Sequence, residues 1–67
     1  MIEIILNGDR RTIEREMPLT ELLKTLGTPE RGVAVACNAR IVPRAERETI
    51  VVRSGDDVEI VTANPGG

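Results

Sequence analysis

Residues 2–16 read IEIILNGDRRTIERE, and this stretch decides how the fold begins. Large aliphatic residues occupy every second position in 2–6, which is typical of a β-strand with one buried face. Asn7-Gly8 follows at once, and this pair suits the positive φ angles of a tight two-residue turn. Residues 11–16 then alternate around an isoleucine as a return strand. The chain is therefore predicted to open with a β-hairpin.

Four leucines follow the hairpin at helical spacing. Residues at i, i+3, i+4 and i+7 share one stripe of a helix, and this pattern is met by Leu19, Leu22, Leu23 and Leu26. Pro18 suits a first helical turn, where its missing N–H would have no partner, and Gly27 suits the left-handed position after the last turn. The sequence predicts a helix of about two turns, followed by a loop at 28–32.

Short strands account for most of the second half of the chain. Runs rich in β-branched and small residues predict strands at 33–37, 40–42, 49–53 and 58–62. The third of these is expected at a sheet edge. Turns are expected at 38–39 and 54–57, and the charged stretch 44–48 is expected to be a loop or a single helical turn.

This order of elements predicts an α+β fold, with one helix packed on one face of a mostly antiparallel sheet. The apolar face of the helix needs an apolar sheet face, which these residues can supply: Ile2, Ile4, Leu6, Ile13, Val35, Cys37, Val58 and Ile60. We expect one domain at 1–62 and a flexible C-terminal tail at 63–67.

Composition excludes several classes of protein. The 67 residues contain no Phe, Trp, Tyr or His and a single Cys, which argues against a disulfide framework, a zinc knuckle or a His-dependent enzyme. Nine basic and eleven acidic residues give a formal charge of −2, which does not suit a nucleic-acid binder. With no membrane-length apolar run and a charged beginning, the expected location is the cytoplasm, and a membrane partner is not expected.

The tail carries the chemistry that the rest of the sequence lacks. Gly66-Gly67 has no side chains, so a short peptide ending there can enter a narrow cleft of another protein and present its carboxylate. The alternative is a frayed end without a role. Asn64 and Pro65 can take part in recognition, or they can simply end the preceding strand.

The chain resembles a known protein family in several of these segments. The segments Ile41-Val42-Pro43-Arg44, 55–61 (GDDVEIV) and Gly66-Gly67, at their separations, are similar to those of the ThiS family of sulfur carriers in thiamine biosynthesis. The resemblance covers essentially the whole chain and implies the ubiquitin-like β-grasp fold. Ala39 departs from the family pattern, because family members commonly have glycine after the strand asparagine. This departure bears on the expected geometry of the turn at 38–39 and not on the expected function.

The resemblance implies a co-substrate and not an enzyme. An E1-like (ThiF-like) adenylating enzyme would use ATP and Mg²⁺ to convert the Gly67 carboxylate to an acyl-adenylate. A persulfide from a cysteine desulfurase would then displace AMP, leaving a thiocarboxylate that gives sulfur to a ThiG-like thiazole synthase. Asn64, Pro65, Gly66 and Gly67 would form the recognised tail. The chain itself would bind no cofactor or metal, because it has no P-loop and no suitable carboxylate cluster.

Other residues permit two interpretations each. If strands 33–37 and 58–62 are neighbours, a small patch faces outward beside the tail, and it either docks partners or is simply exposed; its members are Ala34, Ala36, Glu59 and Val61. Cys37 is either a small core residue or part of a sulfur relay. No basic residue follows Arg53, so Asp56 and Asp57 either steer the tail toward a basic partner or serve only as turn residues.

Two further functions remain open from the sequence. Within the same class, the chain could carry sulfur for molybdopterin synthesis or tRNA thiolation, or act as a ubiquitin-like modifier. From a different class comes the TGS-type β-grasp module, a regulatory or RNA-associated domain whose final strands look like residues 41–62. That module does not depend on a diglycine end, so the effect of deleting Gly67 separates the two classes.

Overall fold

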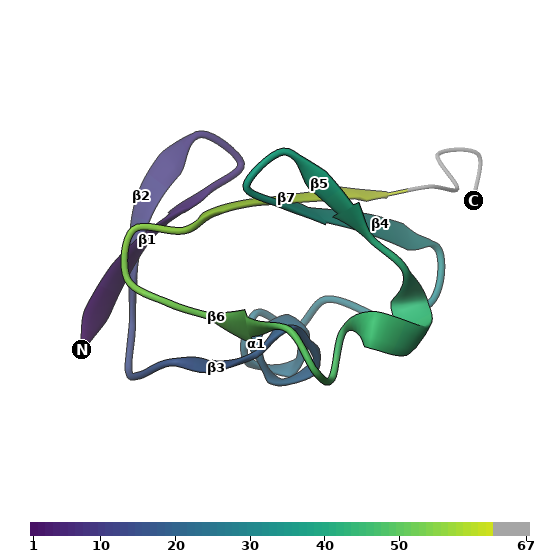
Figure 1. Cartoon of the computed structure of the whole chain (residues 1–67), viewed down its shortest axis with the longest axis horizontal. Coiled ribbons are helices and arrows are strands. Elements are labelled where there is room, and N and C mark those ends of the chain that lie inside the picture. Colours follow the sequence, from purple (N-terminus) through teal and green to yellow (C-terminus); the bar gives the residue numbers. More distant parts are fainter. Residues whose placement is uncertain (63–67) are drawn as a thin grey trace.

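The computed structural model describes residues 1–62 (Figure 1). Its elements, in chain order, are β1 (Ile2–Leu6), β2 (Asp9–Ile13), β3 (Met17–Pro18), α1 (Leu19–Thr25), β4 (Val33–Cys37), β5 (Arg40–Val42), a 3-10 turn (Arg44–Glu46), β6 (Val51–Val52) and β7 (Asp57–Thr62). None of the helices in this range is long and apolar enough to cross a membrane.

Five strands form one mixed sheet in the order β2-β1-β7-β4-β5. β1 and β7 run parallel, and the other neighbouring pairs are antiparallel. Helix α1 lies across one face, in a layer with β3 and β6 (Figure 1). The α+β prediction, with one helix on one face of a mostly antiparallel sheet, is confirmed.

The first hairpin has the expected turn, but its second strand was predicted in the wrong place. Asn7 and Gly8 adopt φ angles of 50° and 86°. Because the turn has only two residues, Asp9 pairs directly with Leu6, and the ladder ends where Ile13 meets Ile2 at the start of β1. Residues 14–16 have no strand residue left to face, so β2 occupies 9–13 instead of 11–16.

The helix forms where the leucine spacing predicts it. Leu19, Leu22 and Leu23 are fully buried, and the C-terminal end has two capping hydrogen bonds. The N–H of Gly27, at a φ of 72°, donates to the Lys24 carbonyl, and the N–H of Thr28 donates to the Leu23 carbonyl. This pattern is a Schellman cap, which requires the left-handed conformation that glycine adopts without steric cost.

Pro18 does not begin the helix as expected. It precedes the first helical residue with an extended ψ of 152°, as part of β3, which pairs with β6 in a separate two-stranded sheet. The strand predicted at 49–53 is therefore reduced to Val51–Val52 and lies outside the main sheet. A two-residue strand leaves no periodic pattern in a sequence, which explains why β3 was missed and β6 misplaced.

One continuous apolar core lies between the sheet and the helix layer. It combines the expected aliphatic residues with Met17, Val42 and Val52. Its central members are less than a tenth exposed, and four partly buried residues pack at its margin: Ile2, Leu26, Ile50 and Ile60. The chain compensates for its lack of aromatic residues by packing aliphatic side chains from nearly every element.

A buried arginine connects the second half of the chain to the core. Arg47 is only 4% exposed, although it lies in the charged stretch 44–48, which was expected to be a loop or a single helical turn. Its guanidinium donates to the carbonyls of Glu30 at 2.9 Å and Val33 at 2.8 Å. Arg47 thus fixes the segment after β5 against the loop that leads into β4.

Candidate functional site

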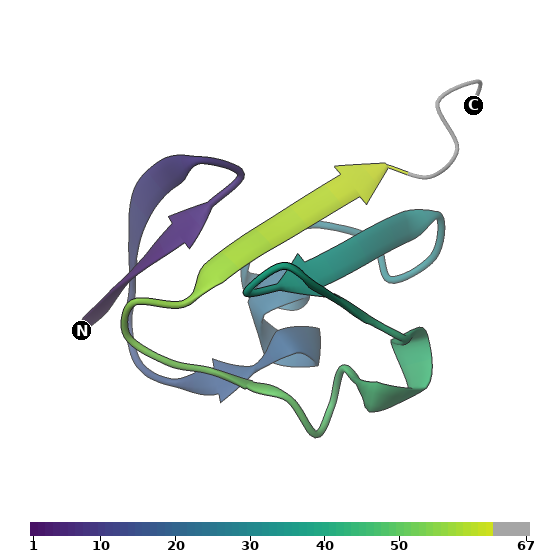
Figure 2. The ribbon, with the colours of Figure 1, turned by 45° about the horizontal axis from the view of Figure 1, so that its top comes forward.

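The strongest predicted site residues, Asn64, Pro65, Gly66 and Gly67, lie outside the described residues, so their role stays a prediction. The structure does describe the strand that leads to them. β7 lies between β1 and β4, and its pairing with β4 continues to Thr62, which faces Val33 (Figure 2). Residues 63–67 therefore follow directly from a strand that is held within the sheet.

Two asparagines hold β7 in place beyond its main-chain ladder. The Asn7 side chain accepts a hydrogen bond from the Ile60 N–H at 2.8 Å and donates to the Ile60 carbonyl at 3.2 Å. It thus continues the parallel ladder past the last residue of β1. On the other side, the Asn38 side chain accepts from the Asp57 N–H at 2.9 Å. Each asparagine therefore occupies a left-handed turn position and also forms side-chain hydrogen bonds with β7.

The turn that contains Ala39 is of the same kind as the turn of the first hairpin. Asn38 and Ala39 have φ angles of 52° and 67°, so the second hairpin has the same two-residue left-handed turn as Asn7-Gly8. For an alanine this conformation costs about 1–2 kcal/mol. The hairpin retains it because Cys37 and Arg40 pair directly across the turn and Asn38 is bound to β7.

The structure brings the four predicted patch residues together. Ala34 lies opposite Val61 and Ala36 lies opposite Glu59 in the β4–β7 ladder, on the sheet face away from α1. They surround a shallow hollow of about 160 Å³. Val61 is 58% exposed, so an apolar surface lies one residue from the end of β7.

Ile41 also belongs to this surface and was missed from the sequence. It lies opposite Ala36 in the β4–β5 pair, lines the same hollow and is 79% exposed. The signal was available: with Val42 buried, alternation along residues 40–42 places Ile41 on the opposite face. We refer to Ala34, Ala36, Ile41, Glu59 and Val61 together as the outer patch.

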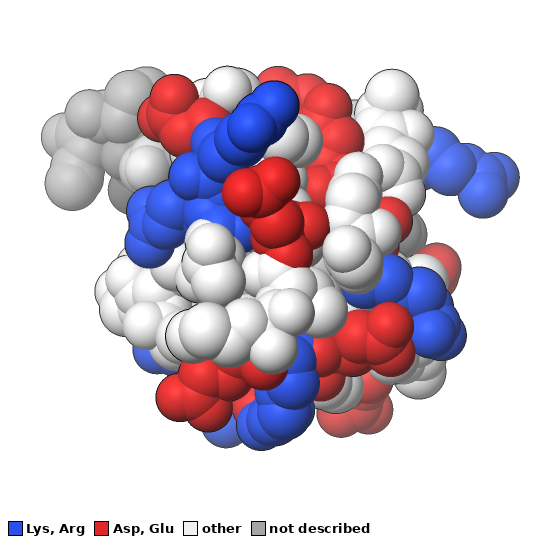
Figure 3. Space-filling model, turned by 90° about the vertical axis from the view of Figure 1, so that its left-hand side faces the viewer, with Lys and Arg blue, Asp and Glu red and all other residues white. Residues whose placement is uncertain are grey.

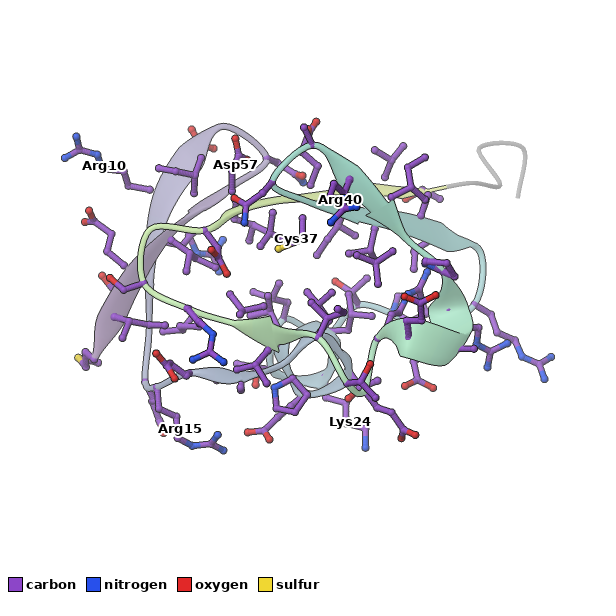
Figure 4. The ribbon with its side chains drawn as sticks, in the orientation of Figure 1. Arg10, Arg15, Lys24, Cys37, Arg40 and Asp57 are labelled. Carbon is purple, nitrogen blue, oxygen red and sulfur yellow. The ribbon has the colours of Figure 1, made fainter. Side chains whose placement is uncertain are left out.

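Cys37 points into the core, as its alternation predicted (Figure 4). It is only 9% exposed. Burial raises the pKa of the thiol above its ordinary value, and the negative charges of Asp56 and Asp57 raise it further. Because the thiolate is the reactive form, burial and the raised pKa both favour the packing role of Cys37 over the sulfur relay.

The acidic residues of the last turn divide into two kinds. The Asp56 carboxylate accepts hydrogen bonds from the Arg53 N–H at 2.8 Å and the Asn38 amide at 3.1 Å, so it stabilises the turn. Asp57 and Glu59 are exposed on β7. Within residues 1–62, no group of three or more acidic or cysteine side chains is arranged to hold a metal ion.

The arrangement of one helix across a five-stranded mixed sheet, with β1 and β7 parallel and adjacent, defines a β-grasp domain. The sequence model of the ThiS family matches residues 4–67. The chain belongs to the ThiS family.

Solved structures agree with this assignment. The crystal structure of a thiamine biosynthesis protein, ThiS, from Geobacter metallireducens matches with a TM-score of 0.86 at 28% identity, over 98% of this chain and 100% of that one. The solution NMR structure of a thiamine biosynthesis protein from the same organism matches with a TM-score of 0.84 at 28% identity, over 98% and 88% of the two chains. The predicted ubiquitin-like β-grasp fold is confirmed.

A curated relative is much longer than this chain. A thiazole synthase from Paramagnetospirillum magneticum is 36% identical over 66 residues, which make up 98% of this chain and 20% of that protein. The chain therefore spans about a fifth of the curated relative that it matches.

Proposed function

We propose that this protein is the sulfur carrier of thiamine biosynthesis and that the Gly67 carboxylate is the functional group that becomes activated and carries the sulfur. The observation that carries the proposal is the ThiS family match, which extends through Gly66 and Gly67, directly beyond the anchored strand β7. The relative named thiazole synthase supports the choice of pathway over molybdopterin synthesis or tRNA thiolation.

The chemistry proceeds by activation and then substitution. A carboxylate is a poor electrophile, so a partner enzyme first transfers AMP from ATP to Gly67 and releases pyrophosphate, with Mg²⁺ bound by that enzyme. A persulfide sulfur then attacks the carbonyl carbon and AMP leaves. Cleavage of the resulting acyl disulfide by a thiol leaves a thiocarboxylate on Gly67. Because these steps consume ATP and need reduced thiols, the cytoplasm is the compartment that suits them.

The carrier's own contribution is to present the tail. The sheet holds β7 at a fixed position, and Asn64, Pro65, Gly66 and Gly67 extend from it into a narrow channel, where the glycines permit close approach of backbone. In this proposal the outer patch contacts the adenylating enzyme and, later, the thiazole synthase. The protein acts as a co-substrate, and the partners supply nucleotide, metal and catalytic groups.

Intact mass spectrometry tests the proposal. The chain, expressed to end at Gly67, is incubated with the cognate adenylating enzyme, ATP, Mg²⁺ and a cysteine desulfurase with cysteine. We expect its mass to rise by the difference between sulfur and oxygen. A chain that lacks Gly67 should show no mass change while its circular dichroism spectrum stays native. Absence of the heavier species with the complete chain would refute the sulfur carrier function.

A further inference from the structure

A groove of about 550 Å³ lies between the helix-side face of the sheet and the segment that follows α1. Its sheet side includes Leu6, Val33 and Ile60, and its other side includes Leu26. Thr62, the last residue of β7, also lines it. The groove is thus partly apolar and lies where the C-terminal segment begins.

The charge of this groove differs from that of the rest of the chain. Among residues 1–62, its only charged lining residues are Arg11 and Arg31, although the chain carries a formal charge of −2. Asp9 shares Arg11's side of β2 but does not line the groove. On the side of the molecule that is on the left in Figure 1, by contrast, acidic and basic side chains are interspersed (Figure 3).

Both arginines lack a carboxylate partner within residues 1–62. The ion pairs of this part of the chain join Arg15 to Glu21 and Arg53 to Glu16. Two exposed guanidiniums beside an apolar floor form a surface that favours an anionic ligand with an apolar portion.

Distance along the chain separates this groove from the reacting atoms. Five residues follow Thr62, and an extended peptide spans at most roughly 17 Å over that length. When the tail is extended into an enzyme, a group in the groove lies near the beginning of the tail and far from the Gly67 carboxylate. The groove is therefore better placed to contact the enzyme surface around the entrance of the tail channel than to contact the nucleotide at the far end of that channel. The described residues also include no aromatic side chain on which an adenine could stack.

The groove and the outer patch lie on opposite faces of the sheet, and both adjoin the end of β7. An enzyme that takes up the tail surrounds this strand end, so it can contact both faces at once. The outer patch offers it apolar surface, and the groove offers it two positive charges.

We propose that this groove docks an acidic segment of the adenylating enzyme, with an apolar side chain against its floor and carboxylates paired with Arg11 and Arg31. This proposal rests on the proposed function, because the partner that it names is the enzyme that activates Gly67. The groove provides affinity and orientation and takes no part in the chemical step.

The test is the ATP–pyrophosphate exchange rate of the cognate adenylating enzyme at increasing carrier concentration. We expect Arg11→Glu with Arg31→Glu to raise KM for the carrier about 10-fold or more with little change in kcat, since opposed charges at a contact weaken binding. The matched control is Arg10→Glu with Lys24→Glu, which makes the same change in net charge at exposed positions that do not line the groove. This control should change KM by less than about 2-fold.

The milder pair Arg11→Gln with Arg31→Gln guards against misfolding, and circular dichroism and thermal unfolding are recorded for every variant. Raising the salt concentration should increase KM of the natural chain more steeply than that of the Gln pair. Equal KM values for groove and control variants would overturn the groove proposal while leaving the carrier function intact. A lower KM in the groove variants would also overturn it, because the chain's own C-terminal carboxylate would then be the occupant. No exchange with the natural chain would instead refute the proposed function.

Discussion

The ten residues of the β4–β7 ladder are divided between its two faces, and the two faces serve different purposes. On the inner face, Val35, Cys37 and Val58 are less than a tenth exposed and contact the core. On the outer face, Ala34 and Val61 lie opposite each other in the same ladder and remain in contact with solvent. Because successive residues of a strand point to opposite faces, one ladder can supply stability on one side and a free surface on the other.

The difference between the two faces shows where amino-acid substitutions are tolerated. Inner residues are constrained by packing, since any lost volume leaves a cavity in a core that contains no large aromatic side chain. Outer residues contribute little to folding, and here the exposed Ile41 and Val61 line one hollow, so they form a joint apolar surface rather than single exposed residues. Such a surface is consistent with the docking role that we propose for the outer patch.

The largest effect is expected from Val58→Ala on the inner face. Val58 is fully buried, and removal of two methyl groups should lower the free energy of unfolding by about 2–3 kcal/mol. That is a large fraction of the stability of a small domain. Urea unfolding followed by circular dichroism measures it. Val61→Ala on the outer face of the same strand is the control and should cost less than about 0.5 kcal/mol. Similar losses for both variants would show that the faces do not differ.

The next effect is expected from Val61→Asp on the outer face. A charge in the outer patch should reduce kcat/KM for adenylation roughly 10-fold, as is common for a central interface residue, with little change in stability. ATP–pyrophosphate exchange measures the rate. Thr12→Asp, at an exposed position on the edge strand β2, is the control and should have no effect. An unchanged rate with Val61→Asp would remove the outer patch from the docking surface.

The smallest effect is expected from the titration of Cys37. Its pKa is raised in the folded protein, chiefly by burial. The folded state therefore holds the thiol proton more tightly than the unfolded state. The stability that comes from the protonated thiol is fully present below the pKa of the unfolded chain, about pH 8.5, and is lost as the pH rises toward the pKa of the folded protein. Unfolding by urea between neutral and alkaline pH should show a decrease in the natural chain that is shallower in Cys37→Ala. The same slope in both proteins would contradict the assignment.

Local patterns in the sequence predicted the elements that have strong periodicity or distinctive turn residues. The leucine stripe located α1, and Asn7-Gly8 located the first turn, because each pattern depends only on neighbours in the chain. The inward orientation of Cys37 and the outward orientation of Val61 followed in the same way from alternation. The four patch residues were also chosen correctly as neighbours, once β4 and β7 were assumed to pair.

Long-range contacts explain what was missed. The end of β2 is set by the length of β1, and the short pair β3 and β6 forms only because residues 17–18 and 51–52 are brought together. Arg47 looked like one more charge in a polar stretch, yet its guanidinium binds carbonyls of Glu30 and Val33, which are distant in the chain. The groove at Arg11 and Arg31 likewise joins residues from β2 and from the loop after α1.

Local sequence patterns were enough to indicate the kind of fold, the inward and outward residues of each long strand, and the family to which the chain is similar. These depend on periodicity and on local φ preferences, which each segment expresses without the others. Two features follow instead from the tertiary arrangement: Asn7 and Asn38 hold β7 from both sides, and two arginines line a groove at its end. These features depend on which segments meet, and that is set by burial of a common core rather than by any one stretch of the chain.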